Sequence, residues 1–128
     1  MDLQALNKAD LHALADRLLV CDDEALQQCI EFFESESLGV WHGRARAMMA
    51  RRFKHCSLTR AQATRLIGVI LERFVQGRFS EQFKDQLRLA LHLDADKVVA
   101  AARGCKSARL EHVRRYAEWI LSSRNAGN

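Results

Sequence analysis

The 128-residue chain contains no proline and only six glycines. Proline is the strongest helix breaker and glycine the next, so little in this sequence would interrupt a helix. No segment shows the alternation of polar and apolar residues that is typical of a strand. With 48% apolar and 28% charged residues, the composition is that of a globular protein. We therefore expect one all-α domain over residues 1–128.

Cysteine is sparse, and no two cysteines form a CxxC pair. Cys21, Cys29, Cys56 and Cys105 are widely spaced along the chain. A chain of this length can bury enough core to fold without disulfides, so we expect reduced thiols that act as small core residues in a reducing compartment. The sequence has no apolar run of membrane-spanning length and its first residues have no signal-peptide pattern. We expect a cytoplasmic location and no membrane contact.

Motifs that carry chemistry are also missing. The sequence has no GxGxxG, P-loop, HExxH or GxSxG motif. His55 and Cys56 are neighbours, but helical geometry points their side chains in different directions, so catalysis through Cys56 is not expected. We expect no catalytic residue, no metal site and no cofactor. An enzyme that uses one acid in a cleft stays an alternative, because such a site leaves little trace in a single sequence.

Capping residues and apolar periodicity predict about seven helices. The expected starts lie near Asn7, Asp23, Val40, Thr59, Ser80, Asp94 and Ser107. Asp23, Thr59 and Asp94 begin successive helical hairpins at intervals of 36 and 35 residues. Periods of this length are typical of stacked helical hairpins, which predicts a short α-solenoid. The alternative is a compact orthogonal helical bundle whose similar helix lengths imitate a period.

Two segments resemble the second helix of a HEAT-type repeat. They are VWHGRARAM at residues 40–48 and LEHVRRYA at residues 110–117, and both combine small residues with arginine. The resemblance covers about residues 22–124, although the first helices lack the proline that is usual in this family. It implies a short α-solenoid whose concave face binds a partner, and assigns no further function.

Negative charge is absent from one long segment. Between Glu36 and Glu72 the chain has no aspartate or glutamate, whereas it has seven arginines and lysines. They are Arg44, Arg46, Arg51, Arg52, Lys54, Arg60 and Arg65. Because the whole chain carries +4, the rest of it carries a net charge of −3. The basic character is therefore local to the predicted third helix and the start of the fourth.

Helical geometry gathers part of this charge into a stripe. At 100° per residue, Arg44, Arg51 and His55 fall on one side of the third helix with Lys54 beside them. Trp41 and Met48 are expected on the opposite, apolar face. Arg52 is expected to point toward the apolar side and to pair with a carboxylate or a helix-end carbonyl.

This stripe, with Arg60 and Arg65 nearby, is the predicted anion-binding surface. We expect a non-enzymatic adaptor module that uses it to bind an acidic or phosphorylated protein partner. The alternative is sequence-independent binding to the backbone of DNA or RNA. A third interpretation is a solvated face that acids of the second helix, Glu31, Glu34 or Glu36, neutralise.

A second candidate patch lies in the last helix. His112, Tyr116 and Trp119 share one side of this helix, with Arg109 and Arg115 nearby. Aromatic and basic side chains in this arrangement can stack nucleic-acid bases. The alternative is that the terminal helix docks its aromatic residues on the preceding hairpin. Because the ends of a solenoid expose apolar faces, a homo-oligomer is also considered.

Overall fold

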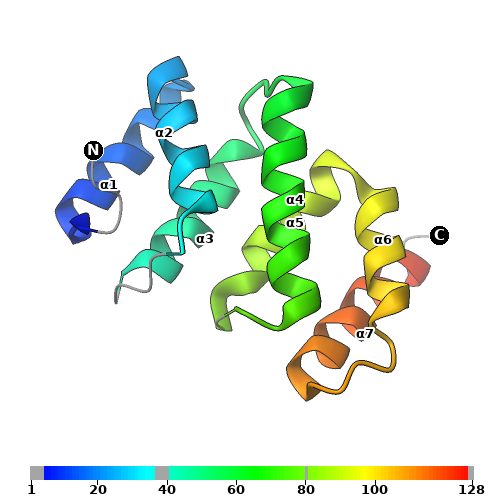
Figure 1. Ribbon diagram of the computed structural model, residues 1–128. Coiled ribbons are helices and arrows are strands. Elements are labelled where there is room, and N and C mark those ends of the chain that lie inside the picture. Colours follow the sequence, from blue (N-terminus) through cyan, green and yellow to red (C-terminus); the bar gives the residue numbers. More distant parts are fainter. Residues whose placement is uncertain (1–4, 37–40, 80, 127–128) are drawn as a thin grey trace.

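The computed structural model describes residues 5–36, 41–79 and 81–126, and every regular element in these ranges is helical (Figure 1). The α-helices are α1 (Lys8–Arg17), α2 (Asp23–Glu34), α3 (His42–Phe53), α4 (Arg60–Gln76), α5 (Lys84–Leu93), α6 (Ala95–Gly104) and α7 (Glu111–Ala126). Two short 3-10 helices accompany them, η2 (Leu18–Val20) after α1 and η3 (Glu81–Phe83) before α5. The all-α prediction is confirmed. No helix of the described ranges combines the length and the apolar character that crossing a membrane requires.

Side-chain caps fix the starts of four helices. Asn7 and Asp10 form a capping box at α1, and Thr59 and Gln62 form another at α4. Asp94 caps α6 by accepting a hydrogen bond from the Lys97 amide at 3.2 Å. These caps satisfy amide groups that the first helical turn leaves without partners. The predicted starts at Asn7, Thr59 and Asp94 are confirmed.

The α2 cap is Asp22, which accepts from the Ala25 amide at 2.9 Å. This hydrogen bond and a second one from Arg17 lower the pKa of Asp22.

The last helix begins later than predicted. We expected a start at Ser107, but α7 begins at Glu111. The guanidinium of Arg114 donates to the carbonyl oxygens of Ala108 and Arg109 at 2.6 and 3.1 Å, which holds the preceding residues in a turn. The predicted starts at Val40 and Ser80 lie outside the described residues.

Gly77 ends α4 in the left-handed conformation, with φ of 72°. A Cβ atom at this position would lie 2.6 Å from Leu110 Cδ1 and 3.2 Å from Val113 Cγ2. Glycine is therefore required both by the backbone conformation and by the close approach of the last hairpin.

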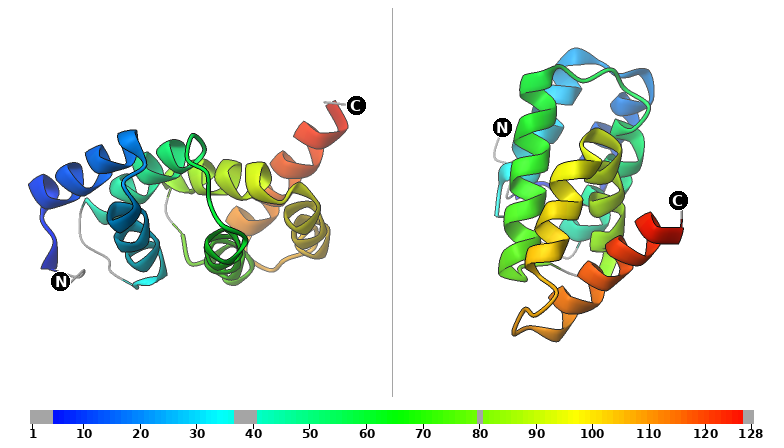
Figure 2. Two further views of the ribbon diagram at one scale, coloured as in Figure 1. Left: turned by 90° about the horizontal axis from the view of Figure 1, so that it is seen from above. Right: turned by 90° about the vertical axis from the view of Figure 1, so that its right-hand side faces the viewer.

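The helices form two layers (Figure 2). Helices α1, α3 and α5 lie side by side in one layer, and α2, α4 and α6 lie in the other. Helix α3 packs on both α1 and α5, and α7 packs on α6. One continuous core runs from Leu11 in α1 to Ile120 in α7. Its largest side chains are the fully buried Phe32, Phe33, Phe53, Phe74 and Phe83.

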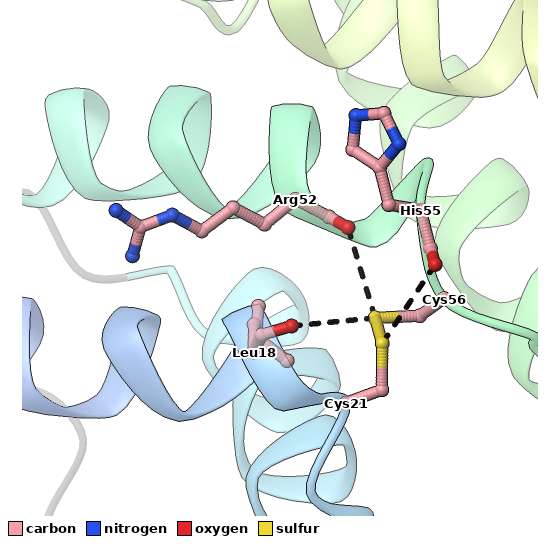
Figure 3. Close-up of a disulfide and its surroundings, with 5 residues drawn as sticks. All are labelled: Leu18, Cys21, Arg52, His55 and Cys56. Atoms are coloured by element: carbon pink, nitrogen blue, oxygen red, sulfur yellow. Dashed lines mark hydrogen bonds between the residues drawn. A yellow bond between two sulfur atoms is a disulfide. The ribbon is translucent and has the colours of Figure 1, made fainter.

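A disulfide joins the turn after α1 to the turn after α3 (Figure 3). Cys21 and Cys56 are bonded, with their Cα atoms 5.6 Å apart, whereas Cys29 and Cys105 are buried free thiols. The expectation of four reduced core cysteines is therefore wrong for this pair. The two residues are 35 positions apart, and only the packing of α1 beside α3 brings their turns together.

We expect Thr59→Ala to lower the free energy of unfolding by about 1 kcal/mol, because it removes the side-chain acceptor of the α4 capping box. Urea unfolding followed by circular dichroism measures this loss. Thr64→Ala, an exposed change inside the same helix, is the control and should leave stability equal or slightly higher. Equal stabilities for Thr59→Ala and the unmodified chain would contradict the role of the cap.

We expect Cys21→Ser/Cys56→Ser to lower the free energy of unfolding by about 2–4 kcal/mol, because the unfolded chain regains the freedom that the cross-link removes. Urea unfolding with and without a dithiol reductant measures the effect. The reductant should destabilise the unmodified chain by the same amount and leave the double variant unchanged. An unmodified chain that the reductant does not destabilise would speak against the bond.

Candidate functional site

A pocket of about 320 Å³ lies between α1 and α3. It is lined by Lys8, Leu11, His12, Trp41, Arg44, Ala45, Met48 and Arg51. These residues provide an apolar floor, one tryptophan, one histidine and three cationic side chains, and none of them is acidic. The pocket therefore combines apolar surface with basic side chains and has no acidic side chain in its lining.

The spacing of residues on each helix explains why they meet here. On α3, the lining side chains recur every three or four residues from Trp41 to Arg51 and therefore form one face. On α1, Lys8 and His12 are one turn apart. We expected Trp41 and Met48 opposite the basic stripe, and this is wrong. Trp41 and Arg44 are only about 60° apart around the helix, so the pocket lies where the apolar and basic sectors meet.

Trp41 is the centre of the charge arrangement. The Nζ atom of Lys8 lies 4.3 Å from the centroid of its ring, and the Cζ atom of Arg44 lies 4.9 Å from it. Each cation–π contact of this exposed kind contributes about 0.5–1 kcal/mol. An aromatic ring holds a cation without neutralising it, and neither cation has a carboxylate partner among the described residues. Both charges are therefore kept beside the pocket.

Two residues of the predicted anion-binding surface are paired within the protein. Arg51 donates to Asp85 of α5 at 2.7 Å, and Asp85 also pairs with Arg88 at 3.3 Å. Arg65 forms a two-point ion pair with Glu34 of α2, and its hydrogen bonds lower the pKa of Glu34. These carboxylates come from helices that pack beside α3 and α4. The self-neutralised face that we gave as an alternative therefore holds for Arg65, with Glu34 as the acid.

The remaining predicted residues lie away from the pocket. Lys54, His55 and Arg60 lie around the turn from α3 to α4, and none of them lines the pocket. The imidazole of His55 points away from the disulfide, and only its backbone carbonyl faces the sulfur atoms (Figure 3). Of the six predicted residues, only Arg44 and Arg51 are brought together at the pocket.

Sequence reasoning missed Lys8 and His12. They are basic residues one turn apart on an otherwise unremarkable helix, and their role depends on the packing of α1 against α3. Residues four apart are neighbours on any helix, so this spacing alone does not distinguish Lys8 and His12 from a solvated pair.

Two other cations of the acid-free segment have structural roles. Arg52 donates to Asp16 of α1 at 3.1 Å, which confirms the predicted pairing with a carboxylate. Arg46 is buried and donates to the Ser35 carbonyl at 3.0 Å, and Arg73 donates to the same oxygen at 2.7 Å. Burial, and then the charge of Arg73, lower the pKa of Arg46 to about 10. Both arginines stabilise the C-terminal end of α2, where the helix dipole favours positive charge.

The second predicted patch docks on the neighbouring hairpin. His112 Nε2 donates to the Gly77 carbonyl at 2.8 Å, and the rings of His112 and Tyr116 contact Phe79 edge-on at centroid distances of 4.8 and 5.3 Å. The arrangement is the docking alternative and not an open platform for bases.

Charged residues surround this patch. Arg115 pairs with Glu111 at 3.2 Å, the side chain of Arg109 is exposed, and Lys84 and Arg88 of α5 lie 5.1 and 5.5 Å from the Trp119 ring. Trp119 is therefore a second aromatic ring that lies beside two cations.

The described residues contain no group of three or more histidine, cysteine, aspartate or glutamate side chains that could hold a metal ion. Cys56 is bonded to Cys21, so its sulfur is not a free thiolate in this state. Burial raises the pKa of the Cys29 thiol to about 12 and also raises that of Cys105. None of the four cysteines is arranged as an activated nucleophile.

Comparison of the chain with models of known protein families, with curated proteins and with solved structures finds no match. The chemistry of the pocket between α1 and α3 is therefore the basis for assigning a function.

Proposed function

We propose that the chain is a non-enzymatic binding module that holds an acidic protein segment at the pocket between α1 and α3. The observation that carries this proposal is the pair of cations, Lys8 and Arg44, held at Trp41 without a carboxylate partner among the described residues. Unneutralised cations beside an apolar surface attract anionic groups more strongly than cations in open water do. Binding of an anionic ligand gives a reason for holding Lys8 and Arg44 together at Trp41.

The shape and chemistry of the pocket define the segment that would fit. Trp41 and Met48 supply the exposed apolar lining of this space of about 320 Å³, because Leu11 and Ala45 are almost fully buried. We expect this lining to contact one apolar side chain of the ligand. Carboxylate or phosphate groups on either side of that anchor would reach Lys8 and Arg44. The expected ligand is therefore a short segment with one leucine or phenylalanine between acidic or phosphorylated residues.

Binding to nucleic-acid backbone is the second candidate, because Trp41 and Trp119 each lie beside two cations. Two observations favour the acidic protein segment. The Trp41 ring already contacts two cations, which compete with a stacking base, and Arg51 and Arg65 are already paired with carboxylates. Two of the cations that a run of phosphates would use are then already paired within the protein.

We also propose that the two layers form a short α-solenoid of HEAT-type character. Contacts at a recurring sequence separation support this arrangement. Cys21–Cys56 and His112–Gly77 are 35 residues apart, and His42–Leu6 and Arg52–Asp16 are 36 residues apart. Three of these contacts join α1 or a residue beside it to the corresponding part of α3 or the turn after it, as neighbouring repeats would. The fourth joins the end of α4 to α7 at the same separation.

Small-angle X-ray scattering tests the solenoid. A compact domain of this length has a radius of gyration of about 14 Å, and we expect a larger value, because stacked hairpins extend along one axis. The forward scattering also reports whether two copies associate. A monomer whose radius of gyration matches the compact value would support the orthogonal bundle instead.

A cytoplasmic location stays a prediction. The disulfide removes one reason for it, the expectation that all four cysteines are reduced. Disulfides in the cytosol are usually transient and redox-sensing. A cytoplasmic location therefore requires that the Cys21–Cys56 bond be reversible.

We expect Lys8→Ala/Arg44→Ala to weaken binding of a fluorescent glutamate-rich peptide with a central leucine about tenfold, because two charge contacts of about 0.5–1 kcal/mol each are lost. Fluorescence anisotropy at 50 and 200 mM salt measures the dissociation constant. The control is Arg103→Ala/Lys106→Ala, which removes the same charge from exposed positions at the end of α6.

Equal weakening of peptide binding by both double variants would show that only the net charge matters. It would contradict the proposal that the peptide binds at the pocket. Parallel titrations with duplex DNA and single-stranded RNA test the second candidate. Tighter binding of either nucleic acid than of the peptide, lost in Lys8→Ala/Arg44→Ala, would replace the acidic segment as the ligand.

A further inference from the structure

The disulfide joins the two helices that form the pocket. Cys21 follows η2, which continues α1, and Cys56 lies three residues beyond the end of α3. Near the starts of the same two helices, His42 Nε2 donates to the Leu6 carbonyl at 3.0 Å. Helix α1 is thus fixed to α3 at both ends but covalently at only one. The pocket residues of both helices lie between these two ties.

Accessibility distinguishes this pair from the other cysteines. Cys21 and Cys56 are only partly buried, whereas Cys29 is fully buried and Cys105 almost so. Because burial raises the pKa of both Cys29 and Cys105, neither forms an appreciable amount of thiolate near neutral pH. Thiol–disulfide exchange is therefore confined to Cys21 and Cys56, without scrambling to the two core thiols.

The surroundings of the sulfur atoms suit the reduced state as well as the oxidised one. Cys56 Sγ lies 3.5 Å from the Leu18 carbonyl oxygen and 3.7 Å from that of Arg52 (Figure 3). Cys21 Sγ lies 3.8 Å from the His55 carbonyl oxygen. Disulfide sulfur has no proton to donate, but each thiol formed on reduction would have a carbonyl acceptor already in place. Reduction can therefore occur without unfolding the two turns.

We propose that Cys21–Cys56 is a reversible redox site that a dithiol reductant cleaves, and that its state controls how firmly α1 is held against α3. A thiolate of the reductant attacks one sulfur, forms a mixed disulfide and releases the other cysteine as a thiolate, which takes up a proton. The second thiol of the reductant then displaces the remaining cysteine. Two electrons pass to the protein, which gains two thiols, and the reductant leaves as a disulfide. Exchange with an oxidised dithiol reverses both steps.

Helix α1 is the element that responds. It has only ten residues and buries Leu11, Leu14 and Ala15, so it depends on tertiary contacts to persist. Once the bond is cleaved, α1 is held to α3 only by non-covalent contacts, which are apolar packing, the His42–Leu6 hydrogen bond and the Arg52–Asp16 ion pair. Local opening of α1 becomes more frequent and carries Lys8 and His12 away from the pocket. Reduction therefore weakens binding of the acidic segment, a consequence that rests on the proposed function.

Thiol counting on the full chain tests the redox site. After treatment with an oxidised dithiol, denaturation and alkylation, mass spectrometry should find two modified cysteines, Cys29 and Cys105. After treatment with the reduced dithiol it should find all four, and re-oxidation should restore the first result. Four alkylated cysteines under oxidising conditions would overturn the proposal.

Hydrogen exchange and peptide binding test the consequence. Exchange of the α1 amides should accelerate on reduction by a larger factor than that of the α4 amides, which reports only the global loss of stability, and the dissociation constant of the glutamate-rich peptide should rise about three- to tenfold. Cys21→Ser/Cys56→Ser should reproduce the reduced values and show no response to dithiol.

The two readouts separate failure of this proposal from failure of the proposed function. Acceleration of α1 exchange by no more than that of α4, or a larger acceleration of α1 with an unchanged dissociation constant, would overturn the proposal that the redox state controls the pocket. A larger acceleration of α1 than of α4 on reduction, with no peptide binding in either state, would overturn the proposed function. It would still support the proposal that the disulfide holds α1 against α3.

Discussion

The packing of α1 along α3 is the constraint on which the other features of this protein depend. It brings Cys21 to Cys56, Asp16 to Arg52 and Leu6 to His42, and it closes the pocket between the two helices. Because α3 also packs on α5, its Arg51 reaches Asp85 on the other side. A single helix thus has one basic side chain satisfied by a neighbour and another left at a pocket.

The basic segment from Arg44 to Arg65 finds its carboxylate partners on other helices and not along its own. The acid-free segment meets its acids in space, through Glu34, Asp16 and Asp85 of neighbouring helices. Arg46 and Arg73 use a helix-end carbonyl instead of a carboxylate. Lys8 and Arg44 keep their charge at Trp41, because a ring stabilises a cation without cancelling its field. The binding surface is therefore much smaller than the charged segment.

The helix starts could be predicted where the capping residue itself carries the signal, whereas the contacts between helices could not. Thr59 and Asp94 carry the signal of a helix start in their own side chains, so the starts of α4 and α6 could be read from the sequence. The start of α7 could not, because a side chain inside the helix, Arg114, holds the turn before it.

For the site, helical angles identified Arg44 and Arg51 but not Lys8, which reaches Trp41 only because two helices pack together. The Cys21–Cys56 bond escaped prediction for the same reason. Spacing along the chain says nothing about which turns meet in space.

Gly77 has a consequence for how this molecule can vary. Its backbone ends α4, its carbonyl accepts from His112, and its missing side chain leaves room for Leu110 and Val113. The same residue thus ends one helix and contacts another, so a side chain at position 77 would have to displace Leu110 and also adopt a left-handed backbone. The tolerance of position 77 to mutation therefore depends also on a segment more than thirty residues downstream.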